Sequence, residues 1–316
     1  MAANPSTQSI AVVGAGGVGG LLAGMLANAG NDVRMLARGA ALAAIRDQGI
    51  RLRGPGVELA VPLTRVADDP AALGVADIVI VTVKTWQLAE LGPRLAPLVG
   101  DRTIVIPTQN GVEASEVLGR SLGDDRVIGG VALVISWAER PGEVRWIGMQ
   151  PSLTIGARNP GQRAPVEACA QTLQTGGINV LVTDQIEQAR WSKLLFITAY
   201  ASVGAALRAP AGVVRKDPAA RARLEATMQE TAAVAAARGV ALPPDAVAKA
   251  MQRIDALPED ATASMHRDLL EGRPSELHEL IGAVVRIGRQ AQVATPVSAE
   301  LYAQLEPLEH KARAAR

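Results

Sequence analysis

The fold is decided by residues 9–20, which read SIAVVGAGGVGG. A short β-branched run ends in glycines at the spacing G-x-G-x-x-G, and a run of small residues with helical character follows at once. In this setting Gly14 permits a tight turn, Gly16 lets backbone approach a pyrophosphate, and Gly19 lets the helix pack closely on the strand. The helix amides and the positive end of the helix dipole then face the phosphates. The stretch therefore predicts a strand, a dinucleotide-binding loop and a helix.

Glycine clusters also mark ordinary turns, and this chain has 31 glycines. The flanking strand and helix favour the dinucleotide loop over a plain turn. The residues expected to contact the cofactor in this loop are Gly14, Ala15, Gly16, Gly17, Val18 and Gly19.

The composition is that of a globular protein with room for about two domains. The chain has 316 residues, of which 48% are hydrophobic and 20% charged, and its formal net charge is +1. A role at nucleic acids or membrane surfaces gains no support, because like charges form no long run. The sequence shows neither a signal-peptide pattern nor an apolar span of about 18 residues. The single Cys169 predicts a reducing, cytoplasmic location, with this side chain buried rather than reactive.

The end of the second expected strand bears on the choice of cofactor. Residues 32–37, DVRMLA, read as this strand, and Arg38 follows it. An NAD-binding unit places an acidic residue near this point to bond the ribose 2′-hydroxyl, whereas an arginine suits a 2′-phosphate. Asp32 lies at the wrong end of the strand to replace that acid. Arg38 therefore favours NADP(H), with a solvated surface arginine as the alternative.

Polar residues follow two further strands. Residues 76–83 form a near-continuous apolar run, as expected of a parallel strand buried on both faces, and lead into Lys84. Residues 103–107 form a similar run that leads into Gln109 and Asn110. Open α/β sheets bind ligands at the carboxyl ends of their strands, so we expect these polar residues at the cofactor site. A simple Asn-Gly turn is the alternative at Asn110.

The rest of the chain divides into further strands and a helical half. Residues 51–62 are expected to form a hairpin, and two later runs form an antiparallel pair around Pro141-Gly142. From residue 184 helical spacing takes over, in segments 184–207, 219–238, 245–254, 275–290 and 298–314. The fold class is therefore α/β: an N-terminal Rossmann-type dinucleotide-binding domain over residues 1–183, followed by an all-helical C-terminal substrate domain over residues 184–316.

With these residues in place, the chain resembles the ketopantoate reductase family (2-dehydropantoate 2-reductases) over nearly its whole length. Besides the Arg38 strand end, the matching motifs are GAGGVG from Gly14, VKTWQ from Val83, QNG from Gln109, WSKL from Trp191 and SMHRDLLEGRPSE from Ser264. The resemblance implies hydride transfer from NADPH to the ketone of a small 2-keto acid, as in pantothenate biosynthesis. The substrate would be ketopantoate or a less polar relative.

The resemblance also implies roles for individual residues. Lys193 is the implied general acid, because reducing a ketone requires a proton for the developing alkoxide. Glu276, expected at a helix start, is its implied partner at the substrate and the nicotinamide ribose. Asn110 would orient substrate and nicotinamide, and Ser264 would bond the substrate carboxylate, with a helix N-cap as the alternative for Ser264. Hydride transfer with a lysine acid needs no metal, and the three scattered histidines predict no metal site.

One departure from the family lies on the lysine helix. The family usually has asparagines four and eight residues after the lysine, which hold the substrate's hydroxyl and carboxylate, but this chain has Ile197 and Ala201. Thr198 and Ser202 do not replace them, since at about 100° per residue they lie on the far side of the helix. Ile197 and Ala201 share the face of Lys193, so we expect them to line a less polar substrate pocket.

A second functional class stays open, that of a non-catalytic NADP-binding sensor. A sensor has no need of Lys193 and Glu276, so their presence favours an enzyme. Trp191 is expected to pack at the domain junction rather than act on substrate. Apart from the 2-keto acid we expect no partner, neither nucleic acid nor membrane; the oligomeric state is open, and a homodimer is compatible with the sequence.

Overall fold

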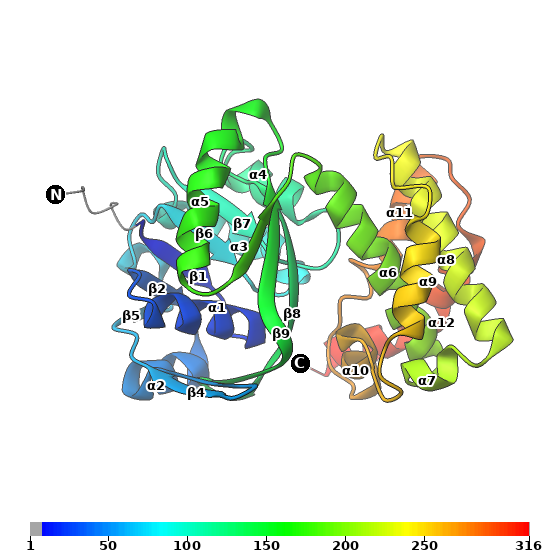
Figure 1. The fold of residues 1–316 in the computed structure, drawn as a ribbon, viewed down its shortest axis with the longest axis horizontal. Helices are drawn as coiled ribbons and strands as arrows, with labels where there is room; N and C mark the ends of the chain where they lie inside the picture. Colours follow the sequence, from blue (N-terminus) through cyan, green and yellow to red (C-terminus); the bar gives the residue numbers. More distant parts are fainter. Residues whose placement is uncertain (1–7, 316) are drawn as a thin grey trace. The chain divides into compact units, whose positions relative to one another are not determined.

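The computed structural model describes residues 8–315, which form two compact units (Figure 1). The first unit comprises the described residues up to Gln109 together with Glu113–Ile186. The second comprises Asn110–Val112 together with the chain from Glu187 on. The boundary expected from the sequence lay between residues 183 and 184, and Asn110–Val112 were expected in the first domain. A three-residue segment thus belongs with a unit that otherwise begins far later in the chain.

A five-stranded parallel sheet forms the centre of the first unit. Its order is β5-β2-β1-β6-β7, so β1 lies in the middle, with Ile10 opposite Val33 on one side and Ile78 on the other. The strand order reverses between β1 and β6, which is where open α/β sheets bind ligands. The predicted Rossmann-type sheet is confirmed. Its strands are β1 (Ile10–Val13), β2 (Val33–Leu36), β5 (Arg65–Ala67), β6 (Ile78–Val81) and β7 (Ile104–Pro107).

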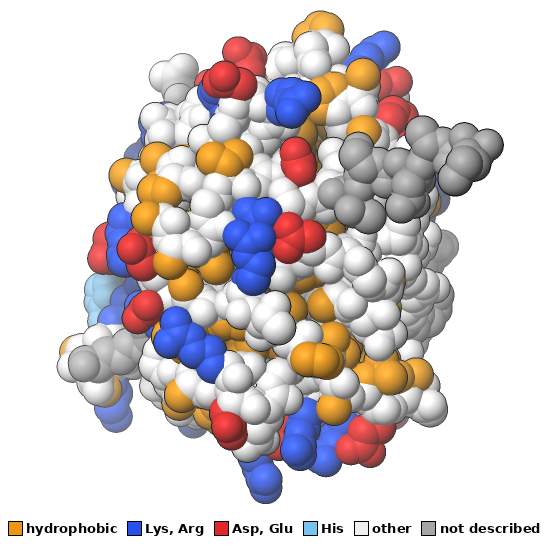
Figure 2. All heavy atoms as spheres, turned by 90° about the vertical axis from the view of Figure 1, so that its left-hand side faces the viewer, with side chains coloured by type: hydrophobic (Ala, Val, Ile, Leu, Met, Phe, Trp, Pro, Cys, Tyr) orange, Lys and Arg blue, Asp and Glu red, His pale blue; other side chains and the backbone are white. Residues whose placement is uncertain are grey.

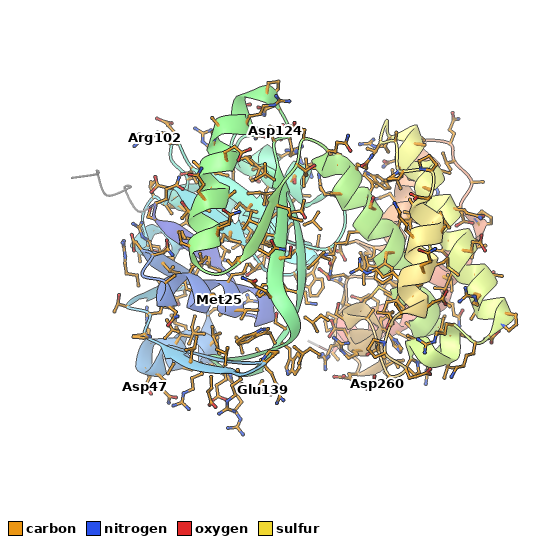
Figure 3. The ribbon with its side chains drawn as sticks, viewed as in Figure 1. Met25, Asp47, Arg102, Asp124, Glu139 and Asp260 are labelled. Carbon is orange, nitrogen blue, oxygen red and sulfur yellow. The ribbon has the colours of Figure 1, made fainter. Side chains whose placement is uncertain are left out.

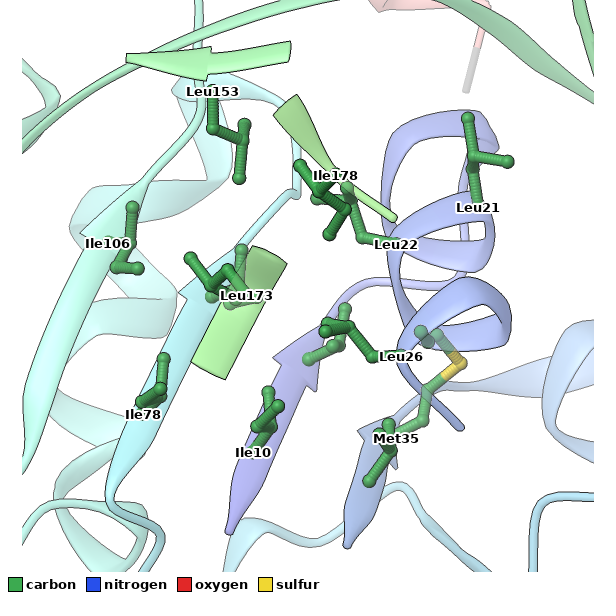
Figure 4. Packing of buried hydrophobic residues seen from close by; sticks show 14 of the residues in the cluster. Ile10, Leu21, Leu22, Leu26, Met35, Ile78, Ile106, Leu153, Leu173 and Ile178 are labelled. Atoms are coloured by element: carbon green, nitrogen blue, oxygen red, sulfur yellow. The ribbon is translucent and has the colours of Figure 1, made fainter. Parts of the chain in front are cut away.

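The central strands are buried on both faces, because successive side chains alternate between two apolar clusters. On one face Ile10 and Ile78 pack with Leu26 of α1, as Figure 4 shows. On the other face Val79 packs with Leu88 of α3. Each large apolar side chain buried in this way contributes about 1.5–3 kcal/mol. The helices of this unit are α1 (Gly17–Asn28), α2 (Gly39–Gln48), α3 (Leu88–Arg94), α4 (Ala114–Leu122) and α5 (Arg163–Thr175).

A second sheet in the first unit contains both predicted hairpins. β8 and β9 run antiparallel and meet at the Pro141-Gly142 turn, while β3 and β4 form a hairpin whose β3 also pairs with β9. β10 pairs in parallel with the far end of β9. Glu139, labelled in Figure 3, accepts a hydrogen bond from Arg145 across the β8–β9 hairpin at 3.1 Å. The strands are β3 (Ile50–Gly54), β4 (Val57–Val61), β8 (Gly129–Arg140), β9 (Glu143–Gly156) and β10 (Asn179–Val182).

The second unit is helical, as predicted, and is built around one apolar cluster. Two short helices, α7 and α10, lie outside the helical segments that periodicity predicts, since four to seven residues carry too little periodicity; the N-cap alternative for Ser264 was the one indication of a helix at α10. The start of the helix predicted from Ser275 was wrong. The backbone at Leu280 (φ −100°, ψ −96°) leaves the helical region, so α11 begins only at Ile281 and Glu276 lies in a turn. The helices are α6 (Ile186–Leu207), α7 (Ala211–Val214), α8 (Pro218–Ala237), α9 (Ala246–Asp255), α10 (Ser264–Leu270), α11 (Ile281–Gln290) and α12 (Pro296–Ala314).

Charges of both signs are mixed on the surface. Figure 2 shows acidic and basic side chains interspersed on the face that it presents, without a large area of one sign. This face therefore lacks the basic stripe that marks a nucleic-acid footprint. No helix within residues 8–315 combines the length and the apolar character that crossing a membrane requires.

Candidate active site

The glycine loop has the geometry that a dinucleotide loop requires. Gly14 has φ +109°, a conformation that side chains disfavour, and a Cβ on Gly19 would lie 1.9 Å from the Gly14 carbonyl oxygen. A Cβ on Gly16, in contrast, would meet no atom within 4 Å, and Gly16 is exposed. Helix α1 has no side-chain cap and no acidic residue in its first turn, which leaves its positive end suited to an anion. A pyrophosphate therefore fits at Gly16.

The other loop residues surround this position. Ala15 and Val18 are partly buried against the main apolar cluster, and a Cβ on Gly17 would lie 2.6 Å from the backbone of Trp137. Thr82 is not among the predicted site residues, yet its Oγ1 lies 2.9 Å from the Val13 carbonyl oxygen and 3.0 Å from that of Gly14. This hydroxyl fastens the loop to the end of β6. Its only signal in the sequence is a threonine near the end of an otherwise apolar strand.

Arg38 and Lys84 both stand at carboxyl ends of strands in the central sheet. Arg38 is exposed, occupies the N-cap position of α2 just after β2, and forms no ion pair within residues 8–315. Lys84 is partly buried after β6, with its ammonium 5.7 Å from the centroid of the Trp86 ring. Because β1, β2 and β6 are parallel neighbours, these cations share one edge of the sheet with the glycine loop. This edge carries positive charge where a dinucleotide carries phosphates.

Gln109, the first polar residue expected after β7, has a structural role. Its side-chain amide donates to the carbonyl oxygens of Val81 and Val83, both at 2.9 Å. The Thr108 hydroxyl donates to Val81 as well, at 2.9 Å. These bonds tie the end of β7 to the loop that bears Lys84, so Gln109 positions that loop.

Asn110 lies in the second unit, where it bonds to a residue 166 positions away. Its side-chain nitrogen donates to Glu276 Oε2 at 2.8 Å. Gly111 has φ +99°, and Val112 is buried in the helical core. The buried Arg190 donates to the Val112 carbonyl oxygen and pairs with Glu187 at 2.6 Å. Asn110 therefore does more than form a turn. The segment 110–112 is fixed by the burial of Val112 and by its bond to Arg190, and this places the Asn110 amide next to Glu276.

Lys193, on α6, faces the same carboxylate. Burial lowers the pKa of Lys193 from 10.5 to about 8; the Glu276 carboxylate opposes this shift and the Arg253 guanidinium adds to it. The Glu276 side chain is itself buried, with 5% of its surface exposed. A lysine with a pKa near 8 is still mostly protonated at neutral pH, yet it releases its proton far more readily than an ordinary lysine. The group is thus suited to general acid catalysis near neutrality.

A further carboxyl group near Glu276 has no counterpart in the sequence analysis. Burial raises the pKa of Glu279 to about 7, and the Glu276 charge adds to that rise. Glu279 Oε2 is buried without a hydrogen-bond partner among the described residues. Near neutral pH Glu279 is therefore protonated in about half of the molecules, which limits repulsion between the two carboxyl groups. Nothing in the pattern SELHEL marks this residue as buried.

The remaining predicted substrate residues differ in exposure. Ile197 is partly buried on α6, whereas Ala201 has no exposed surface and packs within the helical core. Ser264 is partly exposed as the first residue of α10, and the N-cap position belongs to Ala263, so the capping alternative for Ser264 is wrong by one residue. Trp191 packs within the same core. No group of three or more histidine, cysteine or acidic side chains within residues 8–315 is placed to hold a metal ion.

Two family models match the chain along most of its length. Ketopantoate reductase PanE/ApbA matches residues 10–160, and Ketopantoate reductase PanE/ApbA C terminal matches residues 185–309. The chain belongs to the ketopantoate reductase family. The resemblance carried by the glycine, VKTWQ, QNG, WSKL and SMHRD motifs is thereby confirmed.

Individual relatives agree with this assignment. The 2-dehydropantoate 2-reductase of Mesorhizobium japonicum is 30% identical over an alignment of 310 positions that covers 92% of this chain and 94% of that protein. The enzyme of that name from Halobacterium salinarum is 30% identical over 289 residues, 91% of this chain and 94% of the relative. The solved structure of a PanE/ApbA family ketopantoate reductase from Ralstonia eutropha JMP134 superposes with a TM-score of 0.88 at 32% identity and covers 96% of this chain and 99% of its own. A D-mandelate dehydrogenase at 23% identity shares the fold, with a TM-score of 0.89. This ketopantoate reductase family member is therefore an oxidoreductase.

Proposed function

We propose that the protein reduces the ketone of a 2-keto acid with NADPH and that Lys193 supplies the proton. The observation that carries the proposal is the arrangement of Lys193, Glu276 and Asn110 in one unit. Glu276 accepts from Asn110 at 2.8 Å, and its charge opposes the fall that burial imposes on the pKa of Lys193, which settles at about 8. A non-catalytic cofactor sensor would not require this buried charged group.

The residues of the chain divide the work of the reaction. The nicotinamide, when bound, supplies the hydride. Protonated Lys193 donates to the oxygen of the former ketone as negative charge develops on it, and the lysine becomes neutral. Glu276 stabilises the ammonium form before the transfer, and Asn110 fixes the Glu276 carboxylate. A positioned acid of this kind contributes about 10²–10⁴-fold to the rate.

The preference for NADPH rests on Arg38. This arginine stands at the end of β2, where an acidic residue would bond the ribose of NAD, and it has no ion-pair partner within the described residues. An exposed guanidinium without a carboxylate partner is suited to bidentate bonding of a 2′-phosphate.

The preferred substrate follows from Ile197. This partly buried side chain lies one helical turn after Lys193, so it offers alkyl surface next to the proton donor. We propose that the enzyme accepts 2-keto acids with an alkyl or aryl group at this point, together with ketopantoate itself.

The test is the consumption of NADPH, followed by absorbance, with ketopantoate, its deoxy analogue 3,3-dimethyl-2-oxobutanoate, 3-methyl-2-oxobutanoate and phenylglyoxylate. We expect turnover of at least one compound and a loss of about 10²–10⁴-fold in Lys193→Ala. Lys249→Ala is the matched control, because Lys249 is an exposed lysine of the same unit, paired with Asp245. NADPH binding without consumption of any of the four compounds would refute the proposal and favour a sensor.

A further inference from the structure

We propose that Arg253 binds the carboxylate of the 2-keto acid, from a position over the Phe196 ring and next to Lys193. The inference rests on the proposed function and specifies which residue recognises the charged end of the substrate. It assigns to α9 a role that the sequence motifs do not indicate.

Arg253 is positioned by a contact with an aromatic ring of α6. It is an exposed residue in the last turn of α9, and the nearby Ala250 and Ile254 of that helix are buried. Its guanidinium carbon lies 4.5 Å from the centroid of the Phe196 ring, a cation–π contact with α6. Phe196 follows Lys193 by three residues, so both side chains lie on the same face of α6. The guanidinium is thereby directed to the face of α6 that bears the proposed acid.

Arg253 carries an exposed charge that no carboxylate neutralises. Within residues 8–315 it forms no ion pair, although its helix neighbours include acids. Asp255 is engaged by Arg221, and Glu259 is engaged by Arg215 and Lys216. Asp260, labelled in Figure 3, also lies outside ion-pair distance of Arg253. The guanidinium thus remains available to an anion from solution.

The charged side chains around Lys193 have an excess of positive charge that one bound anion would neutralise. Arg253 lies close enough to Lys193 to contribute to the lowering of its pKa, while Glu276 is the one carboxylate that opposes that lowering. Two cations and one carboxylate carry a net charge of +1. A bound 2-keto acid brings one negative charge and would neutralise the group, which relieves the repulsion between the two cations.

Arg253 also replaces donors that this chain lacks. The resemblance to the family implies asparagines four and eight residues after the lysine that hold the substrate's hydroxyl and carboxylate, but this chain has Ile197 and the fully buried Ala201 there. An arginine presents two parallel N–H groups to a carboxylate, a geometry stronger than a single amide donor. A donor from α9 can therefore take over the role of a donor lost from α6.

The experiment compares two substrates that share the same keto group and alkyl group, 3,3-dimethyl-2-oxobutanoate and its methyl ester, of which the ester lacks the negative charge and carries one additional methyl group. We expect Arg253→Met to lower kcat/KM for the acid by about 10- to 100-fold, mainly through KM, because a charge-assisted hydrogen bond is lost. The ester should change by less than about threefold. Arg253→Lys should recover part of the loss, since it restores the charge without the bidentate geometry. The control is Arg289→Met, because Arg289 is another exposed arginine in the last turn of a helix of this unit.

Equal losses for acid and ester would overturn the inference and assign Arg253 to packing on Phe196. An unchanged kcat/KM for the acid would overturn it as well. If Arg253→Met does not fold, Arg253→Gln takes its place, because glutamine keeps an unbranched polar side chain and removes the charge. If the wild type does not reduce the ester, the inference requires KM for the acid to rise at least about tenfold in Arg253→Gln, with kcat within about threefold. A wild type that consumes NADPH with none of these keto acids would instead refute the proposed function.

Discussion

The pH dependence of turnover provides a stringent test of the Lys193–Glu276 pair. With the protonated lysine as the proposed acid, the rate of reduction should fall as pH rises through the pKa of Lys193, which burial brings to about 8. With this pKa about 91% of Lys193 is protonated at pH 7 and about 9% at pH 9, so the rate should fall about tenfold between these values. An ordinary lysine, with a pKa near 10.5, would give almost no change over the same interval.

Glu276→Gln is the perturbation that tests the cause of this pKa. The carboxylate raises the pKa of Lys193, whereas burial and Arg253 lower it, so removal of the carboxylate should move the midpoint to lower pH. The variant should therefore lose more activity at pH 8 than at pH 6. Glu279→Gln is the matched control, because Glu279 is a buried carboxyl three residues further on that does not contribute to the pKa of Lys193.

The assay is kcat/KM for the keto acid against pH at saturating NADPH, because this quantity reports the pKa of the enzyme before the keto acid binds, with NADPH deuterated at the transferred position to show that hydride transfer limits the rate. Wild type and Glu279→Gln should share a midpoint near pH 8, and Glu276→Gln should lie below it. A flat wild-type profile from pH 6 to about 9.5 with a full isotope effect would refute Lys193 as the acid. A midpoint that rises in Glu276→Gln would refute the assignment of Glu276 as its stabilising partner.

Three further predictions follow from the cofactor loop and the pocket. Arg38→Ala should weaken NADPH binding by about ten- to a hundred-fold and NADH binding far less, because charge-assisted bonds of about 1.5–3 kcal/mol are lost; equal losses in a titration would remove Arg38 from that role. The deoxy analogue should exceed ketopantoate in kcat/KM, by no more than about a hundred-fold, since an apolar wall at Ile197 rejects a hydroxyl only weakly; a strong preference for ketopantoate would contradict this. Gly19→Ala should lower the midpoint of thermal unfolding strongly, because the new methyl group would lie 1.9 Å from a carbonyl oxygen, whereas Gly16→Ala should leave it nearly unchanged and weaken NADPH binding. Similar unfolding midpoints for these two variants would contradict this prediction, because they would show that the loop moves to accommodate a methyl group at Gly19.

The parts of the molecule that the sequence predicts well are those encoded by neighbouring residues. The strand, loop and helix around Gly14, the buried strands β6 and β7 and the hairpin at Pro141-Gly142 all follow from local patterns. The parts that escape prediction depend on partners far along the chain. The bond between Asn110 and Glu276 spans 166 residues, and periodicity cannot reveal that the helix predicted from Ser275 begins only after Leu280. The role of Gln109 escapes for the same reason, since its amide binds the backbone of another strand.

The membership of Asn110–Val112 in the helical unit limits how modular this protein can be. A fragment that starts at Glu187 would lack Val112, leaving an apolar void in its core, and the buried Arg190 would lose its carbonyl acceptor. Glu276 would lose the amide that fixes it. A chimera of two relatives with a single crossover between the segment 110–112 and Glu187 would take this segment from one parent. The helical unit that surrounds the segment, with Arg190 and Glu276, would come from the other parent. Recombination within this family should therefore succeed only where the residues around positions 110–112, 190 and 276 are exchanged as a set.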